Sequence, residues 1–74
     1  MSKEGKNKSV DLNKLRFEIM IKNVTQKQIS EKLDITVQSV SNKLRGKTSL
    51  TTDELAVISS MLNKEQSFFL KSLI

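Results

Sequence analysis

The chain has 74 residues, which is the size of one small domain with a limited core. It has no Cys and no His, which excludes disulfides, thiolate or imidazole metal sites and the commonest general base. The formal net charge is +5, and no apolar run is long enough to cross a membrane. With no Pro and two Gly, we expect a helical, cytosolic domain that needs no metal or cofactor.

The positive charge is unevenly distributed along the chain. Residues 1–9 carry a net charge of +2 and residues 22–47 carry +4, whereas residues 48–74 come to −1. DNA phosphates attract such basic segments, so this distribution suits a DNA-binding unit. The alternative is an ordinary, mildly basic soluble protein, and charge alone favours that alternative.

Residues 1–9 contain no apolar residue after Met1 and are predicted to form a disordered basic tail. This tail is either a solubilising terminus or an arm that touches DNA phosphates or the minor groove. Three lysines and no arginine favour the solubilising terminus. Residues 10–74 are predicted to form a single domain.

The first predicted helix lies within residues 10–23. Leu12, Leu15 and Ile19 follow the spacing of an amphipathic helix, and Asn23 suits a left-handed residue at its end. Three further apolar side chains fall partly off this stripe and either widen the buried face or stay exposed: Phe17, Met20 and Ile21.

Residues 25–47 predict two short helices joined by a sharp turn. Thr25 and Thr36 are good N-caps, one for each helix. Ile29 and Leu33 share one face of the first helix. Asp34 tolerates the left-handed backbone conformation that such a turn requires. This is the sequence form of a helix-turn-helix, whose second helix enters the DNA major groove.

The second of these helices, residues 37–45, turns Val40 and Leu44 inward, and Gly46 can close it as a left-handed cap. The opposite face carries the candidate base contacts: Val37, Gln38, Ser39 and Asn42. Amides pair with adenine N6 and N7, and Val packs on the thymine methyl group. The basic side chains toward the carboxyl end are candidate phosphate contacts: Lys43, Arg45 and Lys47. An ordinary solvated polar face is the alternative.

A loop over residues 47–50 precedes a further helix that runs to about Leu62. Thr51 and Glu54 match the capping box at its start. Leu55, Ile58 and Leu62 form its predicted inner face.

Asn63 and Gln66 repeat the capping pattern, which predicts a fifth helix from Lys64. No single face of that helix holds all its apolar side chains: Phe68, Phe69, Leu70, Leu73 and Ile74. We therefore expect an accessible protein interface that includes at least one of three side chains: Phe68, Leu70 and Ile74. A frayed terminus packed loosely on the first helix is the alternative.

Residues 24–47 resemble the DNA-binding core of phage repressor and Cro proteins, the XRE-type helix-turn-helix family. The shared pattern is an apolar residue followed by T-Q, then I-S-x-x-L, I-T, V-S-x-x-L and a closing G-K. Three positions depart from it. Asp34 replaces the common Gly of the turn, Val37 replaces a polar residue, and Lys43 replaces an aliphatic one.

The resemblance implies an all-α, five-helix phage-repressor-like domain that binds double-stranded DNA. It also implies that Gln26 touches the DNA backbone and braces the recognition helix, with a local cap interaction as the alternative. The function it implies is that of a small phage or prophage Cro-like repressor occupying an operator in the bacterial cytoplasm. The alternative is an antirepressor or modulator that binds a larger phage repressor. The expected protein partner is therefore either that repressor or a second copy of the chain in a homodimer. An enzyme is poorly supported, and neither a membrane nor a small-molecule ligand is expected.

Overall fold

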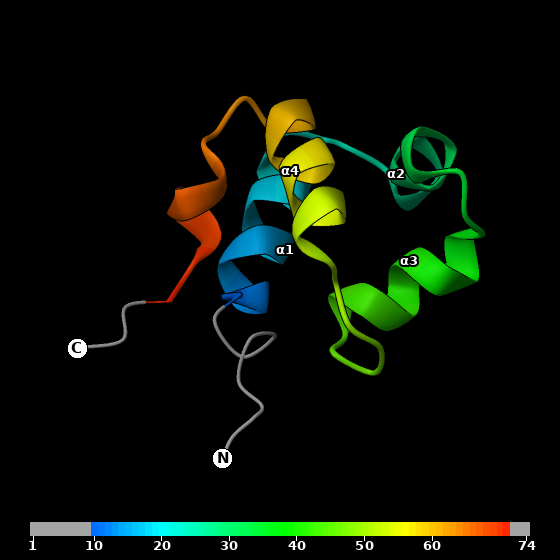
Figure 1. The fold of residues 1–74 in the computed structure, drawn as a ribbon. Helices are drawn as coiled ribbons and strands as arrows, with labels where there is room; N and C mark the ends of the chain where they lie inside the picture. Colours follow the sequence, from blue (N-terminus) through cyan, green and yellow to red (C-terminus); the bar gives the residue numbers. More distant parts are fainter. Residues whose placement is uncertain (1–9, 72–74) are drawn as a thin grey trace, which may run out of the picture.

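The computed structural model describes residues 10–71, and these form four α-helices and one short 3-10 helix (Figure 1). The elements in chain order are α1 (Leu12–Ile21), α2 (Gln26–Leu33), α3 (Val37–Leu44), α4 (Thr52–Met61) and η2 (Gln66–Phe69). The basic tail predicted for residues 1–9, and the roles predicted for Leu73 and Ile74, lie outside the described residues.

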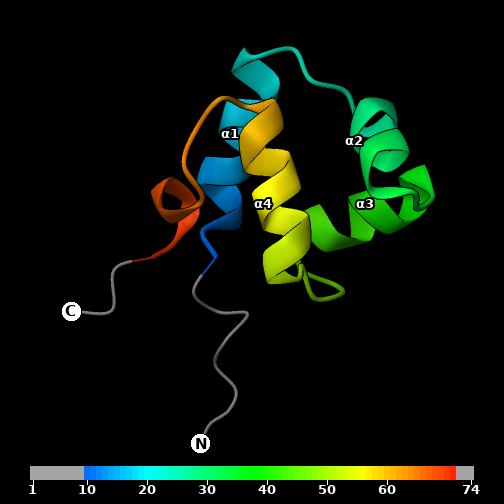
Figure 2. The ribbon, with the colours of Figure 1, turned by 45° about the horizontal axis from the view of Figure 1, so that its top comes forward.

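The helices are arranged around a single core. α2 and α3 pack against each other at one end, where α4 contacts α2 and α1 contacts α3 (Figures 1 and 2). η2 packs against α1 and α4 on the side away from α3. Every element contributes to the buried cluster: Leu15, Ile19, Ile29, Val40, Leu44, Leu50, Leu55, Ile58, Leu62 and Phe69. The inward faces predicted for the four α-helices are therefore confirmed.

Each α-helix begins at a side-chain cap. Thr25 and Thr51 form complete capping boxes, in which the side chain of the third helical residue accepts a hydrogen bond from the backbone amide of the cap residue. The box at Thr51 and Glu54 was predicted from the sequence, whereas the role of Gln28 in the box at Thr25 was not. Such caps stabilise a short helix by about 1 kcal/mol each.

Each α-helix is also followed, within two residues, by a residue with positive φ: Asn23 (59°), Asp34 (59°), Gly46 (82°) and Asn63 (60°). Asn, Asp and Gly tolerate this region best, because their side chains are short or absent. The left-handed ends predicted at Asn23, Asp34 and Gly46 are confirmed. Three of the four α-helices thus end at a non-glycine residue, which explains how a chain with two glycines forms so many turns.

The fifth α-helix predicted from Lys64 is wrong. Asn63 ends α4 in place of capping a new helix, and the next segment is the single 3-10 turn η2. Leu70 then becomes extended and forms a bridge with Val10, while the Asp11 amide donates to the Phe69 carbonyl at 2.7 Å. These contacts with the residues before α1 occupy backbone N–H and C=O groups that would otherwise form hydrogen bonds within a longer helix.

The three apolar side chains that fell off the α1 stripe are all exposed. Phe17, Met20 and Ile21 keep 54%, 63% and 50% of their surface accessible. They do not widen the buried face, because α1 packs with the side that carries Leu15 and Ile19.

Candidate nucleic-acid interface

The turn between α2 and α3 fixes the angle at which α3 leaves the domain. Asp34 has φ 59° and ψ 44°, and its amide donates to the Ser30 carbonyl. The Ile35 amide donates to the same carbonyl at 3.0 Å. Leu33 and Ile35 pack partly buried against the core on either side of the turn. Backbone bonds and apolar packing together hold the two helices in the helix-turn-helix arrangement.

The outward side of α3 carries two amides that contact each other. Gln38 Nε2 donates to Asn42 Oδ1 at 3.2 Å, across one helical turn. Val37 lies beside them at the start of α3 and is 45% exposed. The remaining amide groups and the apolar Val37 side chain face solvent, which is the chemistry that reads base edges in the major groove.

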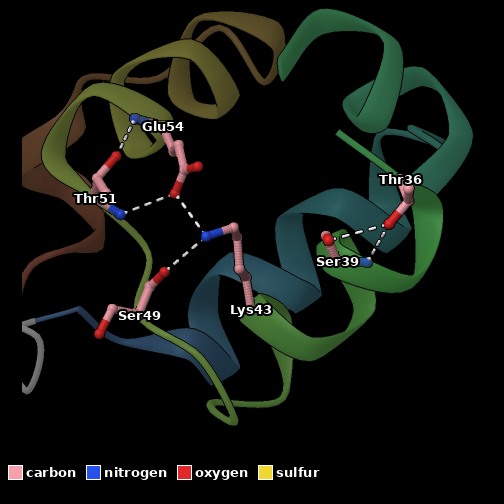
Figure 3. Close-up of polar contacts among 6 residues, drawn as sticks. All are labelled: Thr36, Ser39, Lys43, Ser49, Thr51 and Glu54. Carbon is pink, nitrogen blue, oxygen red and sulfur yellow. Dashed lines mark hydrogen bonds and ion pairs between the residues drawn. The ribbon is translucent and has the colours of Figure 1, made fainter. Parts of the chain in front are cut away.

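One flank of α3 is turned toward the body of the domain. The Thr36 hydroxyl caps α3 by accepting the Ser39 amide and donates to Ser39 Oγ, both at 3.0 Å (Figure 3). Lys43 Nζ donates to the Ser49 carbonyl at 2.9 Å and pairs with Glu54 Oε1 at 3.1 Å. Lys43 therefore links α3 to the beginning of α4.

The pKa of Glu54 reflects this environment. Burial acts to raise the pKa, but the Thr51 amide and the Lys43 ammonium group outweigh it, so the pKa lies below its ordinary value of 4.5. The same carboxylate completes the capping box of α4 through the Thr51 amide at 3.0 Å. Glu54 is consequently charged at neutral pH and serves two helices at once.

The candidate phosphate contacts other than Lys43 are accessible. The side chains of Gln26, Arg45 and Lys47 are exposed and make no hydrogen bond or ion pair within residues 10–71. The local cap interaction considered for Gln26 is therefore not found, since Gln28 makes it. Because seven residues separate Arg45 from Gln38, the two lie on nearly the same side of α3, about 20° apart.

The carboxyl end of α3 is held firmly in place. The Lys47 amide donates to the Asn42 carbonyl at 2.9 Å, which wraps the chain around Gly46 in a Schellman motif. Arg16 Nη1 on α1 donates to the Leu44 carbonyl at 2.7 Å. The positions of Arg45 and Lys47 thus follow from backbone and cap bonds, although their side chains are free to move.

A family model described as helix-turn-helix matches residues 18–65, which spans α2, α3 and α4. The chain belongs to the XRE-type helix-turn-helix family. This family consists of DNA-binding regulators rather than enzymes, and the chain is a DNA-binding regulator of this type. The comparisons with curated proteins and with solved structures each gave no match. No helix within residues 10–71 is long and apolar enough to cross a membrane.

The XRE-type domain has an outward α3 surface that differs in detail from the sequence prediction. Lys43 was expected on it, but its ammonium group is bound on the side that faces α4.

The predicted protein interface is partly described. Phe68 and Leu70 are 37% and 42% exposed, in agreement with the expected accessibility, whereas Ile74 lies outside the described residues. The ammonium groups of Lys14 and Lys64 lie 4.6 and 4.7 Å from the centre of the Phe68 ring. Cation–π contacts of this kind stabilise a half-exposed aromatic ring without a protein partner.

Proposed function

We propose that the protein is a sequence-specific transcriptional regulator of a phage or prophage, a Cro-like repressor that acts by occupying an operator. The observation that carries this proposal is the outward side of α3, where the paired amides of Gln38 and Asn42 are followed by the exposed cations Arg45 and Lys47. The family assignment supports double-stranded DNA as the partner. A repressor of this kind needs no catalytic group, because bound protein excludes competing proteins from the same DNA.

In the proposed complex α3 lies in the major groove. The amide pair formed by Gln38 and Asn42 faces an A·T pair, and Val37 packs on a thymine methyl group. Ser39 reaches a base edge or a phosphate with the hydroxyl proton that its bond from Thr36 leaves free. Gln26, Arg45 and Lys47 contact backbone phosphates and fix the register of the domain on the duplex. Base contacts of this quality contribute about 1–3 kcal/mol each to discrimination.

Lys43 is not part of the proposed phosphate-binding set. Its ammonium group already has an ion pair and a carbonyl partner, and only 16% of its side-chain surface is accessible. Reaching a phosphate would break both contacts, so we assign Lys43 to holding α3 against α4.

A gel-shift experiment tests the proposal. The chain is titrated against a duplex taken from the DNA that flanks its own gene, with and without an excess of unrelated duplex. A complex that survives the competitor supports operator binding. A complex that unrelated DNA removes in proportion to its concentration, or no complex at all, contradicts it.

The second candidate function is that of an antirepressor or modulator that binds a larger phage repressor. The observation that favours it is a set of exposed apolar side chains on α1, in η2 and directly after η2: Phe17, Met20, Ile21, Phe68 and Leu70. Such side chains often mark a protein interface when they cluster. The same surface would serve a homodimer bound to a two-fold symmetric operator.

Single substitutions separate these roles. Leu70→Glu and Ile74→Glu are expected to leave helical content unchanged. If this end forms an interface, both variants lose self-association in sedimentation or binding of the repressor encoded next to the gene in a pull-down. Retention of every association by both variants would place the interface elsewhere.

A further inference from the structure

Gln38 and Asn42 look alike in the sequence, as two amides one helical turn apart, but the structure gives them unequal roles. The bond between them runs from Gln38 Nε2 to Asn42 Oδ1 at 3.2 Å. Gln38 is exposed, whereas Asn42 is partly buried one turn further along α3. Asn42 therefore acts as the acceptor at the base of the pair, and Gln38 as the donor at its outer edge.

The hydrogen-bonding capacity of Gln38 decides what this bond does. A primary amide has two N–H donors and one carbonyl oxygen. The bond to Asn42 uses one donor, and the remaining donor and the carbonyl oxygen of Gln38 are left to bind other groups. An acceptor and a donor on one planar group match adenine, which offers the N6 hydrogens and the N7 lone pair. Guanine offers two acceptors, O6 and N7, and would leave the Gln38 carbonyl oxygen without a donor.

A free glutamine side chain would have to adopt this orientation on binding. Glutamine has several rotatable bonds, and ordering them in a complex costs binding free energy. The bond to Asn42 restricts those torsions before DNA arrives, and α3 itself is fixed at both ends by the Thr36 cap and the Gly46 turn. A preorganised side chain binds more tightly and discriminates more strongly than a mobile one.

We propose that Asn42 is a positioning residue for Gln38, so that the two side chains read one adenine together instead of one base each. This inference rests on the proposed DNA-binding function and specifies how its base readout works. Asn42 contributes its accepting oxygen, and Gln38 makes both hydrogen bonds to the base.

The test uses the full chain and a duplex selected by that chain from a randomised pool. Each A·T pair of the selected duplex is replaced in turn by G·C, and the ratio of the affinities for the original and the altered duplex is measured for the wild type and its variants. The variants are Gln38→Ala, Asn42→Ala, Asn42→Asp and the double alanine variant, with Ser60→Ala on α4 as the matched control. At one position the wild type and the control are expected to prefer A·T by about tenfold or more.

The positioning role predicts a specific pattern at that position. Asn42→Ala loses most of the preference, and the double variant loses no more than Gln38→Ala alone. Asn42→Asp restores the preference, because aspartate keeps an accepting oxygen at the same place, although its charge weakens binding to every duplex alike. If Asn42 served only the fold, Asn42→Asp would not restore the preference for A·T while weakening binding to every duplex alike.

Two results would overturn the inference while leaving the proposed function intact. In the first, Asn42→Ala relaxes a different base pair from Gln38→Ala. In the second, Asn42→Asp loses the preference as fully as Asn42→Ala does. A wild-type chain that selects no sequence from the pool contradicts the proposed function itself, and the inference with it.

Discussion

The two flanks of α3 show how two basic residues only two positions apart, Lys43 and Arg45, acquire different roles. Lys43 is turned toward α4, where the Ser49 carbonyl and the Glu54 carboxylate bind its ammonium group. Arg45 is turned the other way, close to the side of Gln38, and has no partner within residues 10–71. A cation whose partners lie within the domain supports the fold, and one without them is available to a phosphate.

The comparison also explains a departure from the family pattern. Lys43 occupies a position that is commonly aliphatic, and here its ammonium group pairs with Glu54 at the start of α4. The link between α3 and the start of α4 is therefore an ion pair at this position instead of an apolar contact. We therefore expect the effects of substitutions at Lys43 and Glu54 on stability to be coupled.

The largest effect on stability is expected from Glu54→Ala. This change removes the returning half of the capping box of α4 and the partner of Lys43 at the same time. We expect the free energy of unfolding to fall by about 1–2 kcal/mol, measured by urea denaturation followed by circular dichroism. Asp53→Ala, at the adjacent exposed position, is the control and should change it by about 0.5 kcal/mol or less. If the free energy of unfolding fell equally in the two variants, Glu54 would not stabilise both the cap of α4 and the link to Lys43.

Lys43→Met should have a smaller effect. Methionine keeps an unbranched side chain over the same surface but removes the ammonium group, so the expected loss is about 1 kcal/mol or less in the same assay. In a Glu54→Ala background the substitution should cost clearly less, because the pair is already broken. If the two losses simply add, Lys43 and Glu54 do not depend on each other.

The dependence of stability on pH should show the smallest and most specific effect. The pKa of Glu54 is lower in the folded protein than its ordinary value of 4.5, so its contribution is complete above that value. It is lost as the pH falls through the folded pKa, because the folded protein must then bind a proton that the unfolded chain binds more readily. Glu54→Gln should flatten the acid side of the stability profile and leave its slope between pH 6 and 8 unchanged. An unchanged acid side would show that Glu54 carries no such linkage.

The features that the sequence predicted correctly are local ones. The caps at Thr25, Thr36 and Thr51 and the helix ends at Asn23 and Asp34 depend on a few neighbouring residues, and the structure has them as expected. The outward position of Gln38 and Asn42 follows from helical periodicity in the same way.

The features that the sequence could not predict depend on residues distant in the chain. Glu54 lies eleven positions after Lys43, and no spacing rule connects them. Asn63 fits both a helix end and an N-cap, and the choice between these was made by bonds from Val10 and Asp11 to residues 69–70. The different roles of Lys43 and Arg45 likewise follow from the flank of α3 on which each lies and from the partners that the rest of the fold brings to that flank.

The central claim is that the outward flank of α3 binds DNA while the opposite flank holds the fold, and the salt dependence of binding tests it most directly. The slope of log K against log salt concentration is measured for the wild type, Arg45→Ala and Lys43→Met on one duplex. We predict a steep slope for the wild type, a slope smaller by about one for Arg45→Ala, and the wild-type slope for Lys43→Met. A slope lowered by Lys43→Met but not by Arg45→Ala, or a flat slope for the wild type, would contradict the claim.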